Sequence, residues 1–305
     1  MKFLKGLAVT IVGFLLFLSL SAWTTVFMLK QTIVNPDFIV SEINKLDAAE
    51  LGKEMLGEQI KAQLPPELNL SSSAVDEVFD EMGPWFTQEA SRIIYAVFDY
   101  LGGKTDGVLV DISFKPMKTS LETIAVESLS QSLPPEIAML PVEQRGQFIN
   151  EYVRQYLGQI PDNFTFDLNK NNIPPEYQDI VYYLRWGVTN LNMVFWGLIG
   201  LMALWALCLF ALYRDVKGFS RSLASPMLTV GILGFAGIWV SEHLILPQAG
   251  TFGLSLELGR WINQFMVDVG AKLYILYISL AVAGIILLLL SIFWRRKERK
   301  DSAQA

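Results

Sequence analysis

Cysteine and histidine are nearly missing from this chain. Cys208 is the single cysteine and His243 the single histidine among 305 residues. One cysteine cannot form a disulfide within the chain, and one histidine cannot supply the pair of a helical zinc site. No Gly-x-Ser-x-Gly sequence is present to display a serine nucleophile. We therefore expect a non-enzymatic protein with no cofactor, apart from the calcium candidate described below.

Charge is nearly missing from four long stretches. Each has close to the ~20 apolar residues that a helix needs to cross ~30 Å of hydrocarbon. A hydrophobic fraction of 52% and a mean hydropathy of +0.37 exceed what a soluble core requires. The apolar centres contain no Asp, Glu, Lys, Arg or His, which disfavours charge-coupled transport within one chain. The predicted transmembrane stretches are 4–29, 191–213, 227–246 and 273–294.

Basic residues flank these stretches on one side of the expected membrane. Short loops that are rich in Lys and Arg stay in the cytoplasm. Both termini are therefore expected in the cytoplasm and residues 31–188 outside it, in a multi-pass protein of the cell membrane. The basic flanks are Lys2, Lys5, Arg214, Lys217, Arg221, Arg295, Arg296, Lys297, Arg299 and Lys300.

Three regions follow from this topology. Residues 1–30 form the first transmembrane helix as a signal anchor, and 31–188 form an acidic extracytoplasmic helical domain. Residues 189–305 contain three transmembrane helices, a short outer amphipathic loop and a basic cytoplasmic tail. The alternative for the first stretch is a cleaved signal peptide, because 19–21 resembles a small-residue cleavage site. The apolar run continues well past that point, which favours a retained anchor.

The predicted fold is mainly α: a four-helix transmembrane bundle with an extracytoplasmic helical domain that contains two short β-strands. Asn35 and Pro36 are typical of a helix start. Segment 108–114 is rich in β-branched residues, and 164–168 alternates apolar and polar residues, so we expect these two segments to pair as strands. The expected helices are 36–46, 48–63, 73–83, 84–101, 115–132, 141–159 and 174–188, the last continuing into the second transmembrane stretch.

The outer domain is strongly acidic. Residues 31–188 contain 24 Asp and Glu against 11 Lys and Arg, a net charge near −13. Such a surface repels nucleic acid and favours basic partners or cations.

One segment resembles part of a calcium-binding loop. Asp167, Asn169 and Asn171 place oxygen-bearing side chains at the first, third and fifth positions. Pro174 replaces the usual central apolar residue and Gln178 the usual bidentate Glu, so the match is partial. Calcium is accordingly the one metal that the sequence offers a candidate site for.

Other short motifs have simpler interpretations. Gly102-Gly103-Lys104-Thr105 lacks the earlier glycine of a phosphate-binding loop, so a turn between helix and strand is expected. His243 follows Glu242, which favours an interface residue or, alternatively, a pH-responsive pair. The glycine series 231, 234 and 237 predicts close helix packing. Asn69 and Asn163 begin glycosylation sequons, which matter only in a eukaryotic secretory pathway.

Two functional hypotheses remain from different classes. The first is a membrane-anchored protein whose outer domain mediates partner binding or scaffolding at the cell surface, with the lipid bilayer, a membrane or extracytoplasmic protein, or a second copy as partner. The second is an oligomeric channel or transport component with an acidic outer vestibule.

Overall fold

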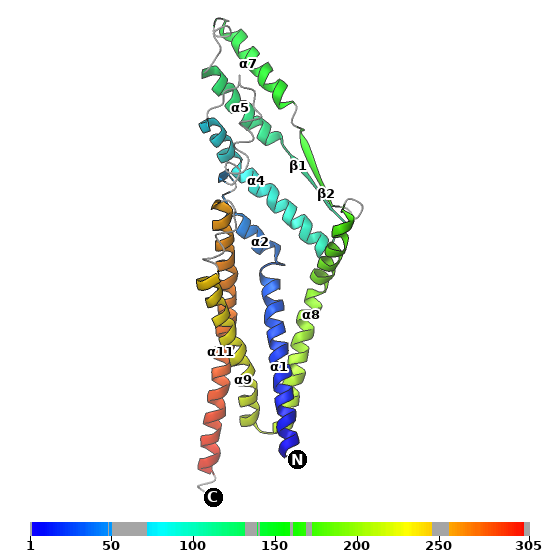
Figure 1. The fold of residues 1–305 in the computed structure, drawn as a ribbon, viewed down its shortest axis with the longest axis vertical. Coiled ribbons are helices and arrows are strands. Elements are labelled where there is room, and N and C mark those ends of the chain that lie inside the picture. Colours follow the sequence, from blue (N-terminus) through cyan, green and yellow to red (C-terminus); the bar gives the residue numbers. More distant parts are fainter. Residues whose placement is uncertain are drawn as a thin grey trace. The chain divides into compact units, whose positions relative to one another are not determined.

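The computed structural model of the chain is mainly helical, with one antiparallel pair of short strands (Figure 1). Four helices are long and apolar enough to cross a membrane, as the uncharged stretches predicted, and they indicate a multi-pass membrane protein. The chain divides into two compact units. The structure describes residues 2–47, 49–50, 72–131, 139, 141–158, 161–168, 173–245 and 256–301.

The first unit consists of Met1–Phe38, Trp186–Gly253 and Ile262–Ala305. Its elements are α1 (Lys2–Gln31), most of α8 (Pro175–Tyr213), α9 (Val216–Val240), the π-helix η2 (Ser241–Ile245) and most of α11 (Leu256–Asp301). Leu20 of α1, Val230 of α9 and Leu280 of α11 form one buried cluster. The indole nitrogen of Trp205 on α8 donates a hydrogen bond to Ser19 Oγ on α1 at 3.2 Å. Helices far apart in the sequence thus pack as one bundle.

Glycines allow α9 and α11 to approach closely. A Cβ atom on Gly231 would lie 2.7 Å from the backbone nitrogen of Ala281, and one on Gly234 would overlap the Tyr277 ring. The corresponding position at Gly237 is open, with no atom of the described residues within 4 Å. The packing role predicted for the glycine series is therefore confirmed at Gly231 and Gly234 and is wrong at Gly237, because that residue does not face another helix closely.

Two lysines hold the carboxyl end of α1 against its neighbours. Lys30 Nζ donates to Asn192 Oδ1 on α8 at 2.8 Å. Lys272 Nζ on α11 donates to the carbonyl oxygen of Gln31 at 3.1 Å and lies 4.2 Å from the centre of the Phe38 ring. Positive charge at this end also complements the negative pole of the helix dipole. The contacts link three of the four long helices.

A tight turn connects α8 to α9. Arg214 adopts a left-handed backbone conformation with φ of 55°. The Asp215 side chain caps α9 by accepting a hydrogen bond from the Gly218 N–H. Any Cβ on Gly218 would overlap the Tyr213 ring, so this turn requires glycine there.

The second unit consists of Ile39–Arg185 and Leu254–Trp261. Beyond the end of α2 (Pro36–Ile43) and the start of α8, it contains α4 (Ser72–Leu101), β1 (Val108–Ser113), α5 (Lys115–Gln131), α7 (Val142–Leu157) and β2 (Asn163–Leu168). Val78 and Met82 of α4 pack on Ile124 of α5, and Tyr100 of α4 packs on Val108 of β1. Because α4 contributes to both clusters, it is the central helix of this unit.

The predicted strand pairing is confirmed. β1 and β2 are antiparallel, with Val110 opposite Phe166. Val110 is buried in the cluster with α4, to which Phe166 also belongs. On the other face, Thr165 donates a hydrogen bond to Asp111 Oδ1 at 2.6 Å. The period-two alternation in the sequence thus corresponds to one packed and one polar face.

Two helix assignments differ from the prediction, apart from shifts of one to three residues at the ends of other helices. Segments 73–83 and 84–101 form the single helix α4 with Pro84 inside it, because buried residues on both sides hold the helix together despite the missing N–H. Residues 258–269, in the amphipathic segment expected between the third and fourth apolar stretches, are helical and belong to α11, continuous with the fourth stretch. Of the predicted helix 48–63, residues 49–50 are helical and the rest lies outside the described residues.

Candidate binding site

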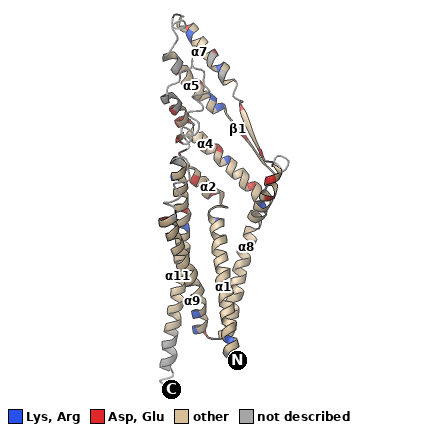
Figure 2. Cartoon of the chain, viewed as in Figure 1, with Lys and Arg blue, Asp and Glu red and all other residues tan. Residues whose placement is uncertain are grey.

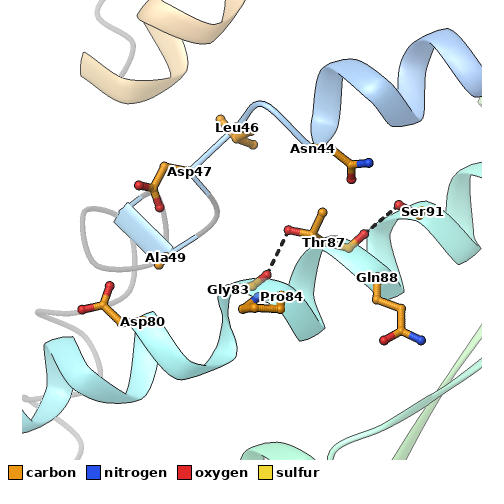
Figure 3. A pocket seen from close by; sticks show the side chains of 10 residues that line it. All are labelled: Asn44, Leu46, Asp47, Ala49, Asp80, Gly83, Pro84, Thr87, Gln88 and Ser91. Atoms are coloured by element: carbon orange, nitrogen blue, oxygen red, sulfur yellow. Dashed lines mark hydrogen bonds between the residues drawn. The ribbon is translucent and has the colours of Figure 1, made fainter.

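An open pocket of about 700 Å³ lies in the second unit, between the turn that follows α2 and the middle of α4 (Figure 3). Its volume falls within the ~300–1,000 Å³ that is typical of ligand sites. In the view of Figure 3, Asp47 and Asp80 lie toward one end and Asn44, Thr87 and Ser91 toward the other. The remaining lining residues are Leu46, Ala49, Gly83, Pro84 and Gln88.

The local sequence explains how the two walls come together. Asp47 Oδ1 accepts a hydrogen bond from the Glu50 N–H at 2.9 Å, which starts a helical turn beside α4. A Cβ on Gly83 would lie 3.5 Å from the Ala49 Cβ, in ordinary contact, so glycine leaves the wall slightly open there. Pro84 supplies no N–H to the preceding turn of α4. Gly83 and Pro84 thus both line the pocket, on the α4 side.

Both hydroxyl groups in the pocket donate their protons to backbone carbonyls of α4. Thr87 Oγ1 donates to the Gly83 carbonyl at 2.9 Å, and Ser91 Oγ donates to the Thr87 carbonyl at 2.8 Å, as the dashed lines in Figure 3 show. Each hydroxyl then presents only lone pairs to a ligand. Asn44 and Gln88 add amide groups that both donate and accept, and the carboxylates of Asp47 and Asp80 make the lining of the pocket acidic. This chemistry suits an ammonium or guanidinium group.

The surface beside the pocket is acidic as well. Asp76, Glu77 and Glu81 are exposed on the same helix as Asp80, within six residues of one another. Glu50 follows the opposite wall and is also exposed. Side chains of one sign around a concavity concentrate the field there and raise the local concentration of cations. The pocket is therefore placed where the acidic surface would attract a basic ligand.

The calcium candidate lies only partly within the described residues. Asp167 lies in β2 opposite Leu109, within the paired register of the sheet. Asn169 and Asn171 lie outside the described residues. In the part of the chain that is described, no group of three or more His, Cys, Asp or Glu side chains is placed to hold a metal ion. The calcium hypothesis thus stays a prediction from sequence.

The side chains of Glu242 and His243 contact different residues. The His243 ring stacks on the Trp239 ring, with centroids 4.8 Å apart, and its Nδ1 lies 3.0 Å from the Trp239 carbonyl oxygen. Glu242 Oε2 instead accepts a hydrogen bond from the Tyr274 hydroxyl at 2.8 Å. A Cβ on Gly270 would lie 2.5 Å from Glu242 Oε1, so glycine makes room for the carboxylate. The carboxylate joins η2 to α11 rather than pairing with the histidine.

The remaining sequence motifs occupy ordinary positions. Gly102 to Thr105 form the turn between α4 and β1, as expected, and Gly103 has a φ of 75°. Lys104 Nζ pairs with Asp99 at 2.7 Å. Asn163 is exposed at the first position of β2, whereas Asn69 lies outside the described residues.

Sequence reasoning did not find the pocket. Its two walls come from segments more than thirty residues apart, and no periodicity connects them. The one local signal was Gly83-Pro84, which the sequence prediction interpreted as a boundary between helices. The ligand chemistry must be inferred from the residues of the pocket itself. No protein-family model, curated protein or solved structure matches this chain.

Proposed function

We propose that this chain is a non-enzymatic binding protein that four transmembrane helices anchor in the cell membrane and whose acidic domain outside the cytoplasm binds a basic segment of a partner protein. The observation that carries the proposal is the open pocket with acceptor groups from Asp47, Asp80, Thr87 and Ser91. A Lys or Arg side chain of the partner enters this pocket, and the exposed carboxylates on α4 attract the rest of the segment.

The charge distribution supports the membrane placement. Figure 2 shows Lys and Arg at the amino end of α1 and at the start of α9, which lie at one end of the first unit. Basic residues at such positions favour the cytoplasmic side. Tyr182, Tyr183 and Trp186 are exposed on α8 just before its apolar part, where aromatic side chains favour the membrane interface. These features support a second unit on the outer side.

Thiol labelling on intact cells tests the topology. In a Cys208→Ser background, Thr119→Cys on α5 provides an exposed reporter in the second unit, and Ser302→Cys provides one near the carboxyl terminus. A membrane-impermeant maleimide should label the first without permeabilisation and the second only after it. The reverse pattern would overturn the proposed orientation and with it the extracellular binding role.

The proposed binding is electrostatic and sensitive to salt. An exposed ion pair contributes only ~0–1 kcal/mol, so one pair gives little affinity. Several carboxylates around one concavity act together on a segment with several positive charges. The field is screened over ~8–10 Å at physiological ionic strength, so affinity should fall as salt is added.

Peptide binding to the full chain in zwitterionic nanodiscs tests the site. A hexalysine peptide is the probe, and the test variant is Asp47→Asn with Asp80→Asn. The matched control is Glu143→Gln with Glu151→Gln, because both residues are exposed on α7 and the net charge changes equally. The proposal expects the pocket variant to lose at least about fivefold in affinity, ~1 kcal/mol, and the control to change little.

Equal loss in the two variants would show that hexalysine binds the general acidic surface and not the pocket. Ion conductance or solute flux in liposomes, without specific peptide binding, would favour the channel or transport component instead.

A further inference from the structure

A groove between α1 and α9 has no role in the partner binding proposed above. It has a volume of about 390 Å³ and lies within the first unit. Gly13, Phe14 and Phe17 of α1 form one side, and Ser225, Pro226 and Thr229 of α9 form the other. Both helices belong to the apolar spans, so the groove faces hydrocarbon wherever the bundle is in a membrane.

Three of the four hydroxyl groups that line the groove are hydrogen-bonded within the protein, and Ser222 Oγ donates to the Tyr213 hydroxyl at 2.8 Å. Thr10 Oγ1 donates to the Gly6 carbonyl at 3.1 Å, and Thr229 Oγ1 donates to the Ser225 carbonyl at 2.9 Å. These hydroxyls are thereby satisfied within their own helices. A Cβ on Gly13 would find no atom within 4 Å, so the groove is open at that point. A flexible apolar chain is the kind of molecule that fits such a space.

Positive charge lies at one end of the groove. Lys5 precedes Val9 by one helical turn, and Arg221 precedes Ser225 by one turn, so each basic residue continues the row that lines the groove. The amino ends of α1 and α9 lie at the same end of the unit (Figure 1). Both side chains are exposed, and neither has an ion-pair partner among the described residues.

The neighbouring groups leave this end basic. Lys5 Nζ lies 5.8 Å from the centre of the Tyr213 ring. The nearby carboxylate of Asp215 accepts a hydrogen bond from the Gly218 N–H as the cap of α9. A phosphate at the level of Lys5 and Arg221 would gain two cationic partners. The planar guanidinium of Arg221 can donate two parallel N–H hydrogen bonds to phosphate oxygens.

We propose that the groove between α1 and α9 binds an anionic phospholipid, with one acyl chain along Gly13 and the phosphate between Lys5 and Arg221. The apolar row and the basic end form a continuous surface of the length and polarity of a lipid. Anionic lipids are concentrated in the cytoplasmic leaflet, which is the leaflet that the proposed orientation assigns to this end. The site is thus an addition to the outer binding pocket and uses none of its residues.

A second copy of the chain is the competing occupant. Small residues such as Gly13 and Ser225 would also let a helix approach closely. In a symmetric dimer through this groove, however, both copies are inserted in the same direction, so Lys5 and Arg221 of one copy would lie near the same residues of the other. The resulting repulsion between like charges opposes self-association, whereas an anionic headgroup removes it.

Native mass spectrometry of the full chain tests the site. The protein is incubated in detergent with equal amounts of phosphatidylglycerol and phosphatidylcholine that have identical acyl chains. The proposal expects preferential retention of phosphatidylglycerol. Lys5→Gln with Arg221→Gln should lower that preference by about fivefold for each charge removed, while retention of phosphatidylcholine is unchanged.

A graded series at Gly13 tests the acyl part of the site. Gly13→Ala and Gly13→Leu extend into open space and are expected to fold, and Leu should reduce retention of both lipids. Gly197→Leu on α8 is the matched control, because its Cβ also finds nothing within 4 Å. Equal retention of the two lipids by the unmodified chain, or retention unaffected by Gly13→Leu, would overturn the proposal. A dimer that Gly13→Leu dissociates, without lipid preference, would assign the groove to a second copy.

Discussion

The backbone nitrogen of Ala281 lies 2.7 Å from the position that a Cβ atom on Gly231 would occupy. This distance is shorter than the contacts that real Cβ atoms make, and a backbone atom cannot move aside as a flexible side chain can. The close approach of α9 to α11 therefore requires glycine at position 231. Close packing matters in such a bundle because apolar helices in lipid have no hydrophobic driving force to associate.

Gly231→Ala is expected to destabilise the bundle by about 1–3 kcal/mol, the usual cost of overpacking. The measurement is thermal unfolding of the full chain in detergent, followed by circular dichroism. Gly237→Ala is the control, because its Cβ position is open and alanine is the better helix former by ~1 kcal/mol. Equal destabilisation by the two substitutions would contradict the close approach at Gly231.

A second prediction concerns Arg185, which fixes the start of α8 to the end of α4 in the second unit. Its guanidinium carbon lies 4.7 Å from the centre of the Tyr100 ring, and its Nη2 donates to the Thr105 carbonyl at 3.1 Å. Arg185→Lys keeps the charge but loses the planar stacking, so we expect a loss of about 0.5–1 kcal/mol in unfolding free energy.

A double-mutant cycle with Tyr100→Leu separates this contact from general effects. The lysine substitution should cost clearly less once the ring is gone. Additive free energies in the cycle would mean that stacking on Tyr100 contributes nothing measurable, in which case the Thr105 carbonyl at 3.1 Å and the Asp106 carboxylate at 3.8 Å are the partners that matter.

The strand pair shows which parts of the fold could be predicted from the sequence. Phe164 and Phe166 alternate with polar residues at period two and lie on one face of β2, where Phe166 packs against α4 and Phe164 is half exposed. The long apolar helices were predictable for the same reason, since their signal lies in consecutive residues. Pro84 misled the prediction because its effect on a helix depends on tertiary contacts, here the burial of Val78 and Met82.

The candidate site was harder to predict than the fold. Asp47 and Asp80 line the same pocket only because the turn after α2 packs beside Gly83. No pattern in either segment predicts that the two segments meet. Likewise, the sequence favoured an interface role for His243 and left a pH-responsive pair with Glu242 as the alternative, but it could not indicate that the Glu242 carboxylate accepts a hydrogen bond from Tyr274, 32 residues away.

Acid should weaken the second unit through Asp162. Lys118 Nζ lies 2.5 Å from Asp162 Oδ1, and this hydrogen bond, with the charge of Lys118 and a smaller effect of Lys115, lowers the pKa of Asp162 below its ordinary value of 3.8. At pH values near and below the ordinary pKa of 3.8, Asp162 therefore binds a proton more readily in the unfolded chain than in the folded one. The stabilisation is complete above the ordinary pKa and disappears as the pH falls through the lowered one.

In the Asp162→Asn variant, the free energy of unfolding should therefore fall less steeply below about pH 4 than in the parent chain. The measurement is unfolding by urea across the acidic range, with Lys118→Met as the reciprocal variant. Since Asp162 is largely exposed, added salt should reduce the difference between the variants and the parent chain. An unchanged acid slope in Asp162→Asn would remove this ion pair from the explanation.

The contact between Tyr274 and Glu242 leads to the last prediction. Glu242 lies in the π-helix η2, at the carboxyl end of a candidate span, where a carboxylate without a donor is costly. Tyr274→Phe removes the hydroxyl that donates to Oε2 and keeps the ring that packs on Phe235. We expect a loss of about 1–2 kcal/mol, since a hydrogen bond to a charged group is lost at a partly buried site.

Tyr277→Phe is the matched control for that substitution. Its ring packs against Gly234 on the same two helices, but its hydroxyl has no hydrogen-bond partner among the described residues. Thermal unfolding in detergent should therefore distinguish the two variants, with Tyr277→Phe close to the parent chain. Equal stability of both variants would show that Glu242 is satisfied by water at the end of the span, and the carboxylate would then be a surface group rather than a link between η2 and α11.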